Sequence, residues 1–140
     1  MTADDGAAPG DDGEVAEYGD FPLKRYLSME VTGDEVGVGV AQLDVGPEHL
    51  NPNSVVHGAV VFALVDTAMG KATMSVLDDG FCASVELSIR FVRPAAAGGL
   101  VARAEVIKRG RHLVHLRADV IGSDERLIAT SHGTFAILGT

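Results

Sequence analysis

Residues 51–66 read Asn-Pro-Asn-Ser-Val-Val-His-Gly-Ala-Val-Val-Phe-Ala-Leu-Val-Asp, and the stretch after His57 is apolar or small until the single carboxylate of Asp66. A helix is predicted to begin at His57-Gly58, and Asp66 lies two turns inside it. Because an unpaired carboxylate is costly to bury, folding alone gives no reason for Asp66. A glycine at a helix start presents its backbone N–H to an incoming oxygen, which the positive end of the helix dipole also attracts. The two features predict a site that polarises a carbonyl group and then attacks it.

The composition indicates one domain that acts on neither nucleic acid nor membrane. The chain has 140 residues, 46% of them hydrophobic, which is enough for one sizeable core. Its formal net charge of −9 argues against a nucleic-acid partner, which requires a basic surface. No apolar run approaches the roughly 18 residues of a membrane span and the N-terminus shows no signal pattern, so we expect a cytoplasmic protein. Cys82 is the only cysteine, which excludes an intrachain disulfide and suggests a small buried side chain.

The first part of the chain divides into a tail and the start of the domain. Residues 1–17 are acidic, glycine-rich and nearly devoid of large apolar groups, which predicts a disordered tail and leaves 18–140 as the domain. Residues 18–27 are predicted to form a short amphipathic piece at the domain edge. In residues 36–45 the apolar positions change parity near Ala41-Gln42, which predicts a strand with a bulge at that point.

One long helix and four strands are predicted to follow. After a loop over 47–54, apolar or small side chains on nearly every face predict a buried helix over about 58–77. Alternation and turn residues predict strands over 83–93, 100–108, 113–121 and 126–138. In the first of these strands, Val85 and Leu87 fall on one face and Ser84 on the other. The order predicts an α+β fold in which a curved antiparallel sheet wraps one long central helix, and a second subunit could complete the cover.

The sequence resembles a known enzyme family. The hotdog-fold acyl-CoA thioesterases of the phenylacetate-degradation type carry a motif similar to Asn51-x-x-Ser54-x-x-His57-Gly58-Ala59, followed by Phe62-Ala-Leu-Val-Asp66-Thr-Ala68. Residues 84–95 and 129–135 resemble two strands of that family, and the likeness extends over roughly 30–138. Ser54 and Ala59 depart from it, since the family prefers glycine at both positions. Ala59 falls in the first helical turn, where replacing glycine should have a mild effect, whereas Ser54 could alter the loop or the acyl pocket.

The resemblance implies a hotdog fold that hydrolyses an acyl-CoA to free acid and coenzyme A, with neither a metal nor another cofactor. It also implies that two subunits pair, as a homodimer or within a homotetramer, and that the site lies at their interface. Helix geometry agrees with a shared site, because Gly58 and Asp66 would lie ~12 Å apart on a straight helix, too far to contact one carbonyl. We therefore expect the partner subunit to supply the opposing group.

The resemblance also assigns roles to the candidate catalytic residues. Asp66 would act as nucleophile or general base, and the sequence does not choose between the two. The Gly58 N–H and the Asn51 amide would hold the carbonyl oxygen, although asparagine is also an ordinary turn former. His57 would orient the loop or the substrate, or its ring could simply satisfy the helix start. Ser84 would place the attacking water, or it could be an ordinary polar strand residue.

The substrate-binding candidates are a loop serine, a helix threonine and three basic side chains: Ser54, Thr67, Arg93, Arg109 and Arg111. A basic turn in an acidic protein could meet the phosphates of coenzyme A, or it could be a solvated face. Four large side chains could line the acyl pocket or belong to the core: Phe62, Met69, Met74 and Phe91. An acyl-CoA-binding module without catalysis is the alternative function, and the retained Asp66 speaks against it. A hydratase or dehydratase of the same fold would need a motif that this sequence lacks.

Overall fold

The computed structural model describes residues 20–139, so the tail predicted for residues 1–17 lies outside the described part of the chain. Within it, two α-helices, a short 3-10 helix and six strands follow one another. In chain order they are α1 (Pro22–Leu27), β1 (Glu30–Thr32), β2 (Val38–Asp44), the 3-10 helix (Pro47–His49), α2 (Gly58–Met74), β3 (Phe81–Phe91), β4 (Gly99–Arg109), β5 (Leu113–Gly122) and β6 (Leu127–Leu138).

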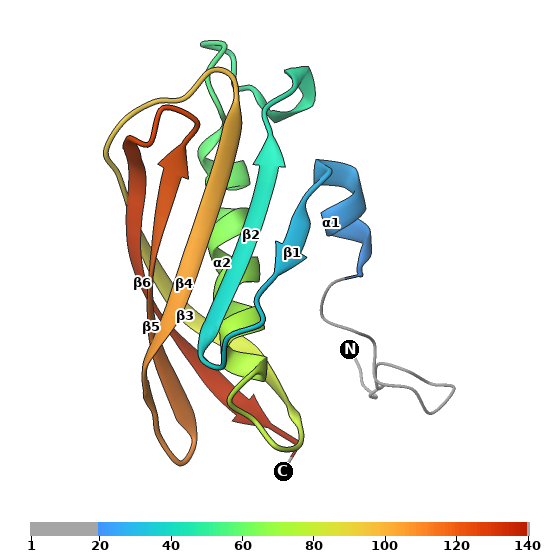
Figure 1. Cartoon of the computed structure of the whole chain (residues 1–140), viewed down its shortest axis with the longest axis vertical. Coiled ribbons are helices and arrows are strands. Elements are labelled where there is room, and N and C mark those ends of the chain that lie inside the picture. Colours follow the sequence, from blue (N-terminus) through green and yellow to red (C-terminus); the bar gives the residue numbers. More distant parts are fainter. Residues whose placement is uncertain (1–19, 140) are drawn as a thin grey trace.

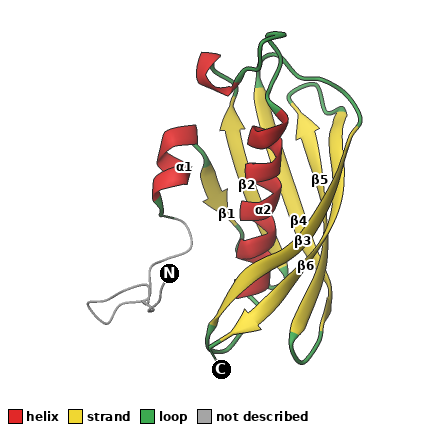
Figure 2. Ribbon diagram, turned by 180° about the vertical axis from the view of Figure 1, so that it is seen from behind, coloured by secondary structure: helices red, strands yellow, loops and turns green. Residues whose placement is uncertain are grey.

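The six strands form one antiparallel sheet in the order β1-β2-β4-β5-β6-β3. The helix α2 lies against one face of the curved sheet and runs roughly along its strands (Figures 1 and 2). The short pair of α1 and β1 stands at one edge of the sheet, and β3 forms the other edge. The predicted α+β hotdog architecture is therefore confirmed. The sequence did not predict β1 or the 3-10 helix, because three residues are too few to show a period.

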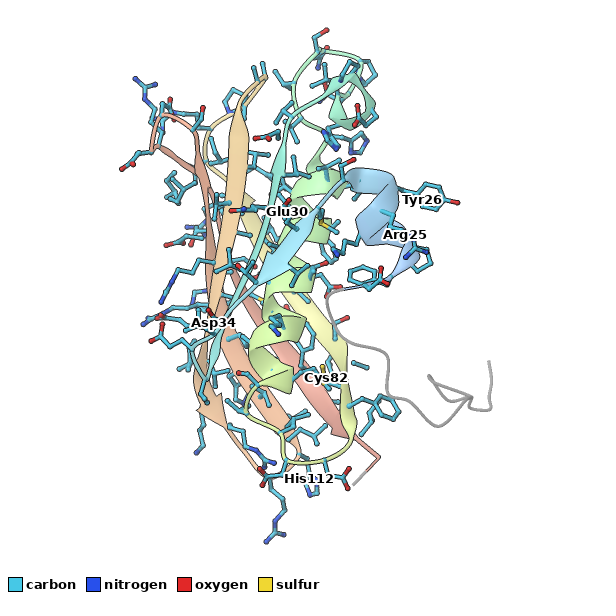
Figure 3. All side chains as sticks on the ribbon, turned by 45° about the vertical axis from the view of Figure 1, so that its right-hand side comes forward. Arg25, Tyr26, Glu30, Asp34, Cys82 and His112 are labelled. Atoms are coloured by element: carbon cyan, nitrogen blue, oxygen red, sulfur yellow. The ribbon has the colours of Figure 1, made fainter. Side chains whose placement is uncertain are left out.

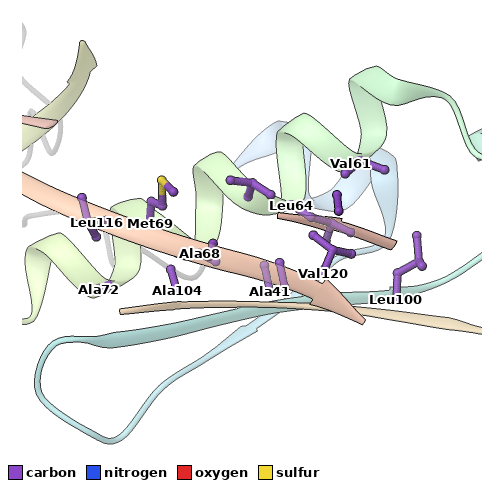
Figure 4. Close-up of a cluster of buried hydrophobic side chains, with 14 of the residues drawn as sticks. Ala41, Val61, Leu64, Ala68, Met69, Ala72, Leu100, Ala104, Leu116 and Val120 are labelled. Carbon is purple, nitrogen blue, oxygen red and sulfur yellow. The ribbon is translucent and has the colours of Figure 1, made fainter. Parts of the chain in front are cut away.

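The core lies between α2 and the inner face of the sheet (Figure 4). The helix contributes a broad buried stripe: Val60, Val61, Leu64, Val65, Ala68, Met69 and Ala72. The alternation in β5 predicts the inward positions correctly, and all four are buried: Val114, Leu116, Ala118 and Val120. Small side chains on β2 and β4 let the helix approach these strands closely: Ala41, Ala102 and Ala104.

The strand β2, which the structure describes in full, has no bulge, so the prediction of a bulge near Ala41-Gln42 is wrong. Its register with β4 runs through without a shift. The small residues Gly39 and Ala41 face α2, and a Cβ on Gly39 would collide with the backbone carbonyl oxygen of Ala68. The prediction failed because it took the valines as the buried side chains, whereas the closest approach of strand and helix requires the smallest residues.

The helix α2 ends at Met74, slightly earlier than predicted. The Ser75 hydroxyl donates to the Ala72 carbonyl at 2.7 Å and accepts the Gly37 N–H at 2.7 Å. The Gly37 carbonyl in turn accepts the N–H of Val106 at 2.8 Å, so the far end of β4 lies beside the C-terminal end of α2. Neither helix in residues 20–139 combines the length and apolarity needed to cross a bilayer.

Candidate active site

The start of α2 holds a backbone N–H group that no described residue accepts. His57 is the N-cap with extended backbone (φ −65°, ψ 139°), and its Nδ1 accepts the N–H of Ala59 at 2.9 Å. The N–H of Gly58 has no hydrogen-bond partner among residues 20–139, and we call such a group open. It lies at the positive end of the helix dipole, where an oxygen with growing negative charge is stabilised. The cap on Ala59 thus leaves the Gly58 N–H available to a ligand.

The loop before α2 is held by the side chain of Asn51. Its Oδ1 accepts the N–H groups of Asn53 at 2.8 Å and of Val55 at 3.3 Å. Ser54 lies in this turn with φ of 63°, in the left-handed region that glycine adopts most easily. Because Oδ1 builds the turn, the amide NH₂ of Asn51 is the part of the side chain that stays open in the described chain. The turn-forming role and a donor role are therefore compatible.

Asp66 is half-buried on α2, in the second turn after Gly58. Its Oδ1 is buried and open with respect to the described residues. Burial raises the pKa of Asp66 above its usual range, and a hydrogen bond from the Ser84 side chain lowers it in part. A poorly solvated carboxylate with an open acceptor is a stronger base than an exposed one, and such groups concentrate at functional sites.

Ser84 faces Asp66 because β3 carries a bulge. The register of β3 with β6 shifts between Ser84 and Glu86, so Val85 is the extra residue. Strict alternation predicted Ser84 on the face opposite Leu87, and this prediction is wrong. One inserted residue reverses the parity, so Ser84 before the bulge and Leu87 after it share the face toward α2.

Cys82 lies on the same face of β3, two residues before Ser84, and packs against the core near α2 (Figure 3). Burial, together with the nearby negative charge of Asp66, raises the pKa of the Cys82 thiol to about 11. The thiol is therefore protonated at neutral pH and a weak nucleophile. Cys82 thus packs against the core as predicted, but it is half-buried rather than buried.

Two apolar grooves meet at Gly58. The first, the loop groove, has a volume of about 330 Å³ and lies between the start of α2 and the segment after β3. The second, the helix groove, has a volume of about 570 Å³ and runs between α2 and β3. Gly58 and Phe91 line both. Phe62 and Phe91 are 44% and 58% exposed and form groove walls, whereas Met69 is fully buried in the core.

The three candidate arginines lie at opposite ends of α2. Arg93 lines the loop groove near Gly58, and its Nη1 donates to the Leu127 carbonyl at 3.3 Å. Arg109 and Arg111 flank the β4–β5 turn, which lies beyond the C-terminal end of α2; His112 in Figure 3 marks this turn. Within one chain, therefore, Arg93 is the predicted arginine that lies near Gly58.

Two other predicted substrate-binding residues lie outside both grooves. Thr67 follows Asp66 in sequence, but a helix turns by about 100° per residue, and Thr67 faces the interior with 4% exposure. Ser54 is exposed in its turn and lines neither groove. Of the groove residues on β3, the sequence indicated only Phe91. Leu87 and Ile89 were missed because they become groove walls only when β3 packs beside α2.

The residues predicted to be catalytic fall into two groups. We call Gly58 and Asn51 the donor half-site, and Asp66 and Ser84 the acid half-site. The eight residues from Gly58 to Asp66 span ~12 Å of helix. The acid half-site lies beside β3, an 11-residue strand whose outer edge pairs with no strand in the described chain. Val85 on this strand is 60% exposed, and long apolar edges of this kind usually acquire a partner.

Known proteins share this sequence pattern and this fold. A family model described as the thioesterase superfamily matches residues 53–129. The acyl-coenzyme A thioesterase PaaI of Escherichia coli is 27% identical over 120 residues, which cover 84% of this chain and 84% of that protein. The 1,4-dihydroxy-2-naphthoyl-CoA hydrolase of Listeria monocytogenes is 26% identical over 116 residues, which cover 82% of this chain and 94% of that protein.

A solved structure extends the similarity to three dimensions. The conserved protein PA5202 of Pseudomonas aeruginosa matches with a TM-score of 0.82 and 27% identity, over 93% of this chain and 100% of that one. The family model spans Gly58, Asp66 and Ser84, and so covers the donor at the helix start and the whole acid half-site. This chain therefore belongs to the thioesterase superfamily.

Proposed function

We propose that the chain hydrolyses acyl-CoA thioesters to a free acid and coenzyme A. One observation carries the proposal: Gly58, whose N–H is open, lines both apolar grooves. A thioester carbonyl bound there has one groove for its acyl arm and one for its coenzyme arm. The helix groove is lined by apolar residues alone, which suits an uncharged acyl group. The loop groove includes Arg93, whose guanidinium suits a phosphate of the coenzyme.

In this proposal the donor half-site holds the carbonyl oxygen. The Gly58 N–H and the Asn51 amide donate to it and stabilise the negative charge that develops during attack. Asp66 then acts in one of two ways. It adds to the carbonyl carbon and expels the coenzyme A thiolate, leaving an anhydride that water hydrolyses, or it takes a proton from a water that attacks directly. The Ser84 side chain, hydrogen-bonded to Asp66, would hold that water in place.

The proposal requires two copies of the chain. The half-site separation of ~12 Å prevents one copy from acting alone, and the unpaired edge of β3 offers a place for a second copy to bind. In a two-fold contact each copy presents the same surface, so each donor half-site meets the acid half-site of the other copy. A homodimer is then the smallest active unit, and a homotetramer of two such dimers would keep the same sites. Two-fold pairing would also bring the β4–β5 turn of one copy, with Arg109 and Arg111, toward the Gly58 end of the other.

Replacing Gly58 with proline should remove the donor and spare the helix. Proline lacks the N–H but fits the first position of a helix, and the extended backbone of His57 suits a residue before proline. We expect Gly58→Pro to lower kcat by about 100- to 1000-fold on acyl-CoA substrates, measured by release of free thiol.

The control is Gly58→Ala, which adds the same Cβ, 3.2 Å from Phe91 Cζ, but keeps the N–H. Its kcat should stay within a few-fold of the wild type. Equal turnover by the two variants would contradict the role of the N–H. A wild-type chain that binds acyl-CoA and releases no thiol would instead be a non-catalytic binding module.

Asp66→Asn should abolish turnover and stabilise the fold. The raised pKa means that the folded chain binds the Asp66 proton more tightly than the unfolded chain does. The stability that this group contributes is therefore present at low pH and is lost as pH rises through the folded-state pKa. At pH 7 we expect Asp66→Asn to melt at a higher temperature than the wild type, and the difference should shrink in acid. The exposed Asp78→Asn is the control, and an equal or lower melting temperature for Asp66→Asn would contradict the assignment.

Ser84→Ala should shift the pH dependence of kcat/KM. The Ser84 hydrogen bond lowers the pKa of Asp66, so its loss should raise that pKa further. Because Asp66 must be ionised to attack or to accept a proton, the acid limb of the profile should move to higher pH. Ser88→Ala, on the opposite face of β3 beyond the bulge, should leave the profile unchanged. Coincident profiles for the wild type and Ser84→Ala would show that Ser84 does not act on Asp66.

A further inference from the structure

His49 is a buried histidine whose polar atoms all form hydrogen bonds. Its side chain is 0% exposed, with Glu48 Oε2 at 3.8 Å from Nε2. Nδ1 accepts the N–H of Gly46 at 2.9 Å, and Nε2 donates to the Leu27 carbonyl at 2.8 Å. On the backbone, the N–H of His49 donates to the Gly46 carbonyl at 3.0 Å, and its carbonyl accepts the N–H of His57 at 2.8 Å. Both ring nitrogens therefore have hydrogen-bond partners.

These bonds join three segments that are separate in sequence. Leu27 ends α1, Gly46 precedes the 3-10 helix, and His57 is the N-cap of α2. The bond from His57 to the His49 carbonyl fixes the peptide immediately before the open Gly58 N–H. The imidazole fixes the turn that carries this carbonyl, and it ties the turn to α1. A continuous set of hydrogen bonds therefore runs from α1 to the donor half-site.

Burying the two polar ring nitrogens of His49 has a cost. An apolar side chain of similar volume would avoid that cost but would leave the Gly46 N–H and the Leu27 carbonyl without these hydrogen-bond partners. The hydrogen bonds of the ring offset that cost and fix the orientation of the 3-10 turn. What the histidine adds over an apolar residue is a fixed direction for the turn and for the loop that follows it.

We propose that His49 is a positioning residue for thioester hydrolysis, which sets the direction of the Gly58 N–H through the backbone of His57. The inference rests on the proposed function. It gives α1 a part in supporting the site, although α1 lines neither groove. A small rotation of the peptide before Gly58 would turn the donor away from the carbonyl oxygen, and positional errors of about 1 Å can cost about 100-fold in rate.

Two substitutions separate the two ring bonds. His49→Asn keeps an acceptor close to the backbone, where Nδ1 accepts the Gly46 N–H, but is too short to reach Leu27. His49→Gln keeps a donor at about the reach of Nε2 and loses the nearer acceptor. His49→Leu loses both bonds. We expect kcat to fall about 10-fold in each single-bond variant and about 100-fold in His49→Leu, with KM within about twofold of the wild type.

A core variant controls for loss of stability. Val114→Ala removes a fully buried side chain from β5, remote from the loop, and should lower the melting temperature while leaving kcat near the wild-type value. Should His49→Leu fail to fold, the Asn and Gln variants carry the test. Folded Asn and Gln variants that turn over at the wild-type rate would overturn the proposal, because no positioning role would remain for either bond.

Amide hydrogen exchange provides a readout that does not depend on activity. The His57 N–H is held by the His49 carbonyl, so its exchange should accelerate about tenfold or more in the Asn and Gln variants and stay unchanged in Val114→Ala. If the wild type hydrolyses no thioester, the proposed function fails and exchange still decides whether His49 orders the helix start. If activity depends on Gly58 while the His49 variants keep both turnover and protection, the inference about His49 alone fails.

Discussion

The half-buried carboxylate of Asp66 is an electrostatic cost that the rest of the fold must offset. It lies on a helix whose other faces are apolar or small, and its Oδ1 is both buried and open within the described residues. Burial raises its pKa, and the Ser84 side chain offsets part of that cost. A group held at the expense of stability is typical of a site built for reaction. The surrounding fold supplies the stability that this group lacks, through the core packed between α2 and the sheet.

The donor half-site differs from the acid half-site, because hydrogen bonds hold its loop in place. Several polar groups of its loop are held by hydrogen bonds: the Asn51 oxygen closes the turn, the His57 ring caps Ala59, and the His49 carbonyl holds the His57 N–H. Among the described residues this network leaves open the Gly58 N–H and the Asn51 amide NH₂, and Gly58 lines two grooves with apolar walls. An oriented donor in an apolar setting stabilises negative charge more strongly than the same donor in water. One half-site thus offers hydrogen-bond donors and the other offers an acceptor.

Local periodicity predicted much of this arrangement. The apolar pattern after Gly58 predicted the helix, and alternation predicted the inward face of β5. The run from Asn51 to Asp66 contains the residues of both half-sites except Ser84. Ser84 was recognised by resemblance, but its direction could not be predicted, because the bulge at Val85 depends on the register between β3 and β6. The close approach of Gly39 to α2 was missed for a related reason, because it depends on how the strand and the helix pack together. The position of Arg109 at the far end of α2 likewise follows from strand pairing between distant segments.

Purified mixed dimers test most directly whether the donor and the acid of one site come from different copies. Gly58→Pro and Asp66→Asn chains, each inactive alone, would be co-expressed with two different tags and isolated as dimers that contain one chain of each kind. If each site takes its donor from one copy and its acid from the other, such a dimer has one intact site and one doubly impaired site. The expected turnover per mixed dimer is then about half of the wild-type value. If both groups of a site belong to the same chain, neither site is intact, and mixed dimers with no activity above that of the parent variants would contradict the account.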